Sequence, residues 1–136
     1  MKRTIVLVLT LMLAGRSMTL AFIGSAGSTT PGAPPAAWLM PLIGDAVIGV
    51  SALIIAFLFA RRSGIWVWTA IITWNVVGIW DALSAFVIHT TVPWPEFFMT
   101  QIFGSSMFFI ASAMHVLIII LVNQTEVRQA LLGITR

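Results

Sequence analysis

The sequence contains no cysteine and no tyrosine, and its four acidic residues are accompanied by only two histidines. Without cysteine the chain has no disulfides, no thiolate nucleophile and no cysteine-ligated zinc or iron–sulfur site. Few groups remain for acid–base chemistry, and the common catalytic motifs of hydrolases, zinc proteases and phosphate-binding loops are missing. We therefore expect a protein that is not an enzyme, with no catalytic residue, no metal site and no cofactor.

Charge is also scarce. Charged residues make up 8% of the 136 residues and hydrophobic residues 60%, whereas a soluble domain carries about 25% charged residues. So little charge cannot cover a surface that faces water, which predicts an integral membrane protein surrounded by the lipid bilayer. The net charge of +3 comes from scattered cations. It does not form the basic patch that nucleic acid requires, so we expect no nucleic-acid partner.

Long apolar runs fill most of the chain. Each is close to the roughly 20 residues with which an α-helix crosses about 30 Å of hydrocarbon, and the lack of water in the bilayer requires a helix. The sequence thus predicts an all-α fold, a four-transmembrane-helix bundle that forms a single domain over residues 1–136, with a short polar to amphipathic tail at 123–136. The expected helices cover about residues 4–24, 38–60, 65–88 and 97–122.

The loop cations predict how the bundle is threaded. With four crossings all six fall on one side, and the opposite loops, 25–37 and 89–97, contain no lysine or arginine. The positive-inside rule then places both termini in the cytoplasm, as in a multi-pass protein of the inner (plasma) membrane of a bacterial cell. The six are Lys2, Arg3, Arg61, Arg62, Arg128 and Arg136.

The first run allows a second interpretation. Lys2 and Arg3, the apolar stretch to Ala14 and the small residues at 24–26 are also typical of a cleaved signal peptide. Cleavage would leave three helices and remove Arg16. The apolar run extends past Arg16 and is long for a signal peptide.

Three ionisable residues fall at one depth in the predicted membrane. At about 1.5 Å per residue, Arg16 lies about 18 Å from the cytoplasmic end of its helix, or about 12 Å below the outer face. The same count puts Asp45 about 10 Å and Asp81 about 12 Å below that face. Ionisable groups at this depth need partners, so the sequence predicts a cluster of one cation and two carboxylates.

The cluster has two interpretations. It is either a structural contact that holds helices together or a proton or cation site, since two close carboxylates discourage joint ionisation. Small residues share a helix face with each aspartate, which lets helix backbones approach closely in lipid. These residues are Gly49, Ala52 and Ala56 beside Asp45, and Asn75, Gly78 and Ala85 beside Asp81.

His115 is expected about 25 Å along the fourth helix, in the cytoplasmic half and apart from this cluster. There we expect it to hydrogen-bond Asn75 or a serine across the bundle. His89 lies near the other end of the membrane, too far in depth for both histidines to hold one haem. The predicted binding residues are thus Arg16, Asp45, Asn75, Asp81 and His115.

Three stretches carry a resemblance to a family. "PLIGDAVIGVSALIIA" at 41–56, "WNVVGIWDAL" at 74–83 and "SAMHVLII" at 112–119 resemble small uncharacterised bacterial four-helix membrane proteins. The shared pattern is a Gly-Asp pair, a Trp-Asn-x-x-Gly-x-x-Asp stretch and a histidine in the last helix. It covers about residues 36–122. The resemblance implies the four-helix architecture and supplies no activity.

Three functions fit these observations. The first is a non-enzymatic helper or structural subunit that docks to a larger membrane complex or to itself as a homo-oligomer. The second is a small proton- or cation-coupled transporter that uses the Arg/Asp cluster. The third is a membrane protein that binds haem, quinone or pigment, with Trp74, Trp80, Phe103 and Phe108 as walls.

Overall fold

The computed structural model describes residues 1–134, which contain helices, turns and loops and no strand. Within this range four segments are long and apolar enough to cross a membrane: Lys2–Ile23, Ala36–Arg61, Ile65–Thr91 and Ser106–Asn123. The all-helical fold and the four apolar spans agree with the sequence analysis. Arg136, one of the six predicted cytoplasmic cations, lies outside the described residues.

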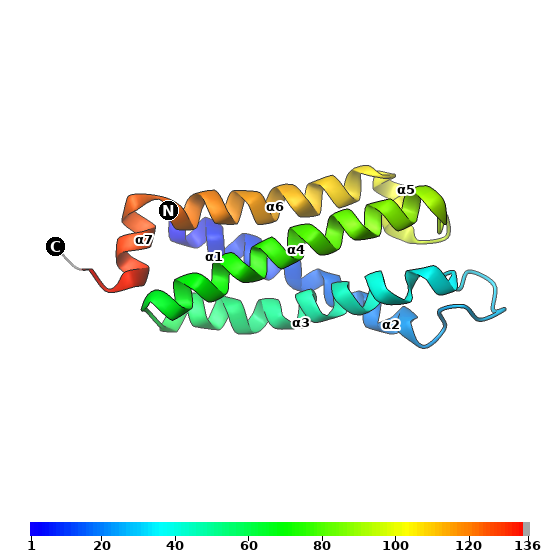
Figure 1. Ribbon diagram of the computed structural model, residues 1–136, viewed down its shortest axis with the longest axis horizontal. Coiled ribbons are helices and arrows are strands. Elements are labelled where there is room, and N and C mark those ends of the chain that lie inside the picture. Colours follow the sequence, from blue (N-terminus) through cyan, green and yellow to red (C-terminus); the bar gives the residue numbers. More distant parts are fainter. Residues whose placement is uncertain (135–136) are drawn as a thin grey trace.

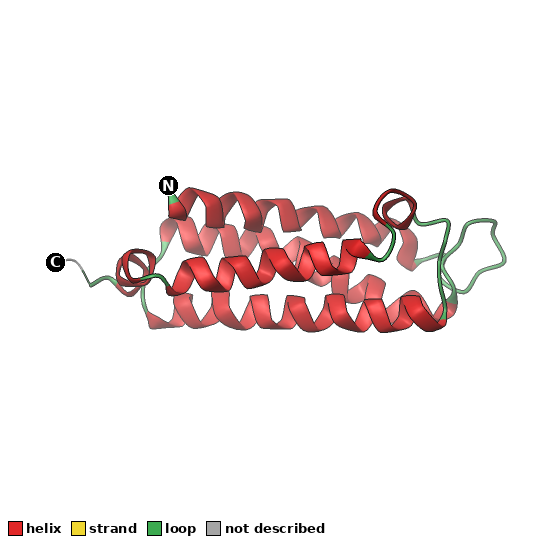
Figure 2. Ribbon diagram, turned by 90° about the horizontal axis from the view of Figure 1, so that it is seen from above, coloured by secondary structure: helices red, strands yellow, loops and turns green. Residues whose placement is uncertain are grey.

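The spans form a ring of four neighbours (Figures 1 and 2). The first span packs on α3, α3 packs on α4, α4 packs on α6, and α1 closes the ring against α6. The elements are α1 Lys2–Leu13, the 3₁₀ helix η1 Ala14–Thr19, α2 Leu20–Ile23, the 3₁₀ helix η2 Ala36–Trp38, α3 Leu39–Arg61, α4 Ile65–Thr91, α5 Phe98–Phe103, α6 Ser106–Asn123 and α7 Thr125–Leu132.

The first span is not the continuous α-helix expected at about 4–24. Residues Ala14–Thr19 form the 3₁₀ helix η1 between α1 and α2, a tighter form that is frequent in short pieces. The hydroxyl of Thr19 lies 2.8 Å from the carbonyl oxygen of Arg16 and 3.1 Å from that of Leu42 on α3. Gly49 of α3 admits the η1 backbone, because a Cβ there would overlap the main chain of Ser17. The tightened turn therefore lies directly on α3.

The fourth expected helix, 97–122, is also interrupted. The short helix α5 ends at Gly104, and α6 begins at Ser106. Gly104 has φ of 56°, in the left-handed region that favours glycine. The spanning helix is therefore shorter than predicted. Residues whose position was counted from Phe97 lie closer to the start of this helix than expected.

Residues 125–132 of the expected polar tail form the helix α7, which lies across the end of the bundle that carries the N-terminus (Figure 1). Val127 and Leu131 bury the apolar face of α7. The N–H of Gly64, in the α3–α4 turn, donates to the carbonyl oxygen of Leu131 over 2.6 Å. We call this end the N-terminal end.

Cations gather at the N-terminal end. Lys2 pairs with Glu126 of α7 at 3.3 Å, and Arg3 donates to the carbonyl oxygen of Phe59 near the end of α3. Arg61 is the last residue of α3, Arg62 follows it in the α3–α4 turn, and α7 carries Arg128. All cations predicted to share one side, as far as the described residues include them, lie at this end.

The opposite end, which we call the aromatic end, is closed by rings. Trp38, Trp94, Phe97 and Phe108 form a buried cluster there. The indole of Trp38 donates to the carbonyl oxygen of Val92 at 2.7 Å, and that of Trp94 to Gly32 at 3.1 Å. These bonds tie together the loops that connect the spans, so the aromatic end is covered.

Candidate functional site

Arg16 projects from η1 into the middle of the ring, and 12% of its side chain is exposed. Its guanidinium forms ion pairs with two carboxylates on different helices. Nε donates to Oδ1 of Asp45 on α3 at 2.6 Å, and Nη2 pairs with both Asp45 and Asp81 of α4. The planar donor fork of arginine suits several acceptors at once. The predicted contact of these three residues is present.

His115 joins the same cluster, which the sequence analysis did not expect. Nη1 of Arg16 lies 3.2 Å from Nε2 of His115 on α6. Residues 106–115 place His115 only about 14 Å along α6, in the layer of the aspartates. The predicted depth was wrong because the helix was counted from Phe97 instead of Ser106.

The hydrogen bonds around His115 define its tautomer. Guanidinium nitrogens only donate, so Nε2 accepts from Arg16. Nδ1 then carries the proton and donates to Oδ1 of Asn75, 2.9 Å away. The amide of Asn75 in turn donates to the carbonyl oxygen of Ile71 over 2.8 Å. The imidazole is neutral in this arrangement, and the predicted bond from His115 to Asn75 is present.

Two glycines make room for these polar side chains. A Cβ at Gly44 would overlap the carboxylate of Asp81, and one at Gly78 would overlap the imidazole of His115. Trp74 packs edge-on against His115, with ring centroids 5.2 Å apart, and donates its indole N–H to Ser51 at 2.8 Å. The polar cluster is therefore packed tightly where Gly44 meets Asp81 and where Gly78 meets His115.

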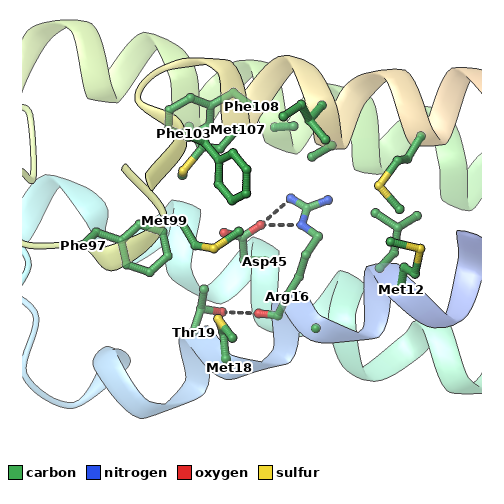
Figure 3. A pocket seen from close by; sticks show the side chains of 17 residues that line it. Met12, Arg16, Met18, Thr19, Asp45, Phe97, Met99, Phe103, Met107 and Phe108 are labelled. Atoms are coloured by element: carbon green, nitrogen blue, oxygen red, sulfur yellow. Dashed lines mark hydrogen bonds and ion pairs between the residues drawn. The ribbon is translucent and has the colours of Figure 1, made fainter. Parts of the chain in front are cut away.

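A pocket of about 330 Å³ opens on the other side of Arg16. Figure 3 shows Arg16 and Asp45 side by side within it, among methionine and phenylalanine side chains. The sulfur and aromatic groups come from the first span, α6 and the segment before it. They are Met12, Met18, Met99, Met107, Met114, Phe97, Phe103 and Phe108.

The pocket opens sideways from the bundle. The first span packs on α3 along its whole length, whereas it packs on α6 mainly through α1. Gly15, Met18, Phe103 and Ile110 line the pocket and are exposed on the outer surface of the bundle. The aromatic end of the bundle is covered, so the pocket does not open there. The mouth of the pocket lies between η1 and α6, within the length of the apolar spans.

A second hollow lies on the opposite side of the ring, between α3 and α4. It is lined by Ala37, Pro41, Trp80, Asp81 and Ser84, among others. It begins near η2 at the aromatic end and reaches Asp81. The two carboxylates thus face different sides, since Asp45 lines the first pocket and Asp81 the second hollow.

All five predicted binding residues belong to one connected cluster, but they play different parts. Arg16 and Asp45 line the pocket, whereas Asn75 and His115 are fully buried behind them. Of the four walls expected for a cofactor, Phe103 and Phe108 line the pocket, whereas Trp74 packs against His115 and Trp80 is 75% exposed.

Sequence reasoning missed Thr19, which shapes η1, and Gly44, which admits Asp81. The sequence did point to Gly44, because it precedes Asp45 in the Gly-Asp pair of the family pattern.

Within residues 1–134, no group of three or more histidine, aspartate or glutamate side chains is placed to hold a metal ion. No protein-family model, no curated protein and no solved structure matches the chain. The function therefore has to be inferred from the pocket and the polar cluster.

Proposed function

We propose that this chain is a non-enzymatic helper protein of the inner (plasma) membrane that binds an apolar or amphipathic small molecule taken from the bilayer. The molecule occupies the pocket between η1 and α6. The observation that carries the proposal is a cavity of about 330 Å³ among the apolar spans, with a polar floor formed by Arg16 and Asp45.

The composition of the pocket supports this function. Ligand sites are concave and mostly apolar, with a few placed polar groups that fix orientation. Methionine side chains adapt to ligands of irregular shape, and five of them line this cavity. An ionic contact that only held helices together would have no need of an open apolar chamber beside it.

The proposed orientation of the bundle in the membrane is consistent with a pocket that opens at its side. We place both termini in the cytoplasm, because the described cations other than Arg16 gather at the N-terminal end and segments 25–37 and 89–97 contain none. The positive-inside rule then assigns this end to the cytoplasm. The pocket lies between the two ends, where a molecule dissolved in the hydrocarbon reaches it directly.

Photolabelling in lipid nanodiscs tests the proposal. A neutral hydrocarbon diazirine should attach to Asp45 at the floor of the pocket after illumination. Ala111→Trp fills the cavity from α6 and should abolish the Asp45 adduct. Leu117→Trp, on the exposed surface of the same helix, is the matched control and should leave the adduct intact. An Asp45 adduct that is absent from the wild type, or that persists in the filled variant, contradicts the proposal.

A second candidate function is supported by the hollow that reaches Asp81. A proton- or cation-coupled carrier needs an ionisable group accessible to water, and Asp81 lines a recess that begins at the aromatic end. A cysteine at Ser84 should react with a membrane-impermeant thiol reagent applied from that side. One at Val76, on the exposed outer surface of α4, should not, because lipid would cover it in the proposed orientation. An unreactive Ser84→Cys protein would remove this candidate.

A further inference from the structure

The charges around the pocket do not balance. Two carboxylates, Asp45 and Asp81, face one guanidinium, and the hydrogen bonds of His115 make its imidazole neutral. With both carboxylates ionised the cluster carries one negative charge. The acidic residues Glu96 and Glu126 lie outside the spans, and the cations of the N-terminal end lie at the ends of the spans or beyond them. No other described charge contacts the cluster.

Arg16 has little capacity left for a ligand. Nε and Nη2 contact carboxylates, and Nη1 contacts Nε2 of His115. An anionic head group in the pocket would therefore meet the carboxylate of Asp45 and an arginine that Asp45 and Asp81 already neutralise. At low dielectric, like charges at such separations repel strongly, which disfavours anions at this site.

Asp45 offers the free acceptor. Its Oδ1 takes the bond from Arg16, while no hydrogen bond among residues 1–134 involves its Oδ2. The side chain is 22% exposed and lines the pocket. A carboxylate oxygen that is open to an otherwise apolar chamber is a site for a cation or a strong donor.

The walls suit a cation as well. Phe97, Phe103 and Phe108 line the chamber, and aromatic faces attract positive charge. Polarizable methionine sulfurs complete the lining. Such walls bind the apolar substituents of an organic cation while Asp45 binds its charge.

We infer that the pocket is selective for lipophilic organic cations, with the positive centre held against Oδ2 of Asp45. This inference rests on the proposed function, since it requires that the pocket takes a ligand at all. It adds the charge of that ligand and names the residue that selects it.

Two probes of the same shape and opposite charge test the inference. Radiolabelled tetraphenylphosphonium and tetraphenylborate are titrated against the protein in phosphatidylcholine nanodiscs, with the Ala111→Trp protein as the blank. The phosphonium should bind saturably and at least about tenfold more tightly than the borate, a difference of about 1.4 kcal/mol.

Two carboxylate variants locate the selectivity. Asp45→Asn should weaken phosphonium binding at least about tenfold and leave borate binding unchanged or improved. Glu126→Gln, an exposed carboxylate at the N-terminal end, should change neither. Because the wild type alone supplies the comparison of the two probes, the inference stays testable if Asp45→Asn does not fold.

The outcomes separate this inference from the proposed function. If both probes bind equally and Ala111→Trp blocks both, the pocket takes ligands without selecting charge, and the cation inference is overturned alone. If neither probe shows binding that Ala111→Trp removes, both the inference and the proposed function fail.

Discussion

Gly78 on α4 lies directly against the imidazole of His115 on α6, with no space between them for a β-carbon. This contact lets His115 lie between Asn75 and Arg16 and bond to both. A single backbone position therefore determines whether the fourth span reaches the polar cluster.

Gly78→Ala should destabilise the protein. The added methyl group overlaps the imidazole, and overpacking of a closed interior costs about 1–3 kcal/mol. The measurement is the unfolding free energy in mild detergent. Gly15→Ala is the matched control on the first span, because a Cβ there has no atom within 4 Å, and it should leave stability unchanged or slightly raised. Equal stability of the two variants would contradict the close contact.

Removing Arg16 should cost more than removing the whole ionic cluster. Arg16→Met leaves two carboxylates in the bundle without a counter-charge, and breaking a buried pair in this way costs about 3–5 kcal/mol. The triple variant with Asp45→Asn and Asp81→Asn removes the charges together and should recover most of that loss. Thermal unfolding of the single and triple variants in one detergent measures the difference. A triple variant less stable than Arg16→Met would show that the three residues are not coupled.

Asn75→Leu should destabilise the protein by leaving Nδ1–H of His115 without an acceptor. A buried donor that loses its partner costs about 1–3 kcal/mol. Asn123→Leu is the control, since the amide of Asn123 also donates to a carbonyl four residues earlier, at 2.8 Å, but is exposed at the end of α6. Comparable unfolding free energies for the two variants would argue against the bond between Asn75 and His115.

The threading is tested with single cysteines, which the chain otherwise lacks. A cysteine at Ser28, in the loop of the aromatic end, should react with an impermeant maleimide on intact cells. One at Ser63, in the α3–α4 turn, should react only after the membrane is opened. The reverse pattern would invert the proposed orientation.

The polar cluster could be predicted in part because depth is simple to count along unbroken helices. Asp45 and Asp81 lie on α3 and α4, whose bounds differ little from the expected ones, and both contact Arg16. His115 was placed apart from them because Gly104 breaks the fourth run. Whether a glycine interrupts a helix in lipid depends on the loop that precedes it, here packed by Trp94 and Phe97, and not on the glycine alone.

The pocket could not be predicted from the sequence. Its existence depends on the first span separating from α6 within η1 while it stays packed on α3. That arrangement requires the hydroxyl of Thr19 and the close approach at Gly49, both of which are contacts between segments distant in sequence. The methionines and phenylalanines around the pocket are typical of any apolar helix. They line a pocket only because the first span separates from α6 at η1.

Solid-state NMR of the protein in bilayers tests the central claim most directly, namely that Arg16 connects the first span to the other three through one polar cluster. With labelled arginine, aspartate and histidine, Arg16 should show through-space contacts to both aspartate carboxyl carbons and to a neutral His115 protonated at Nδ1. The variant His89→Gln identifies the signal of His115, since the chain has two histidines. Contacts of the Arg16 guanidinium with lipid phosphorus, and none with the carboxyl carbons, would contradict the account.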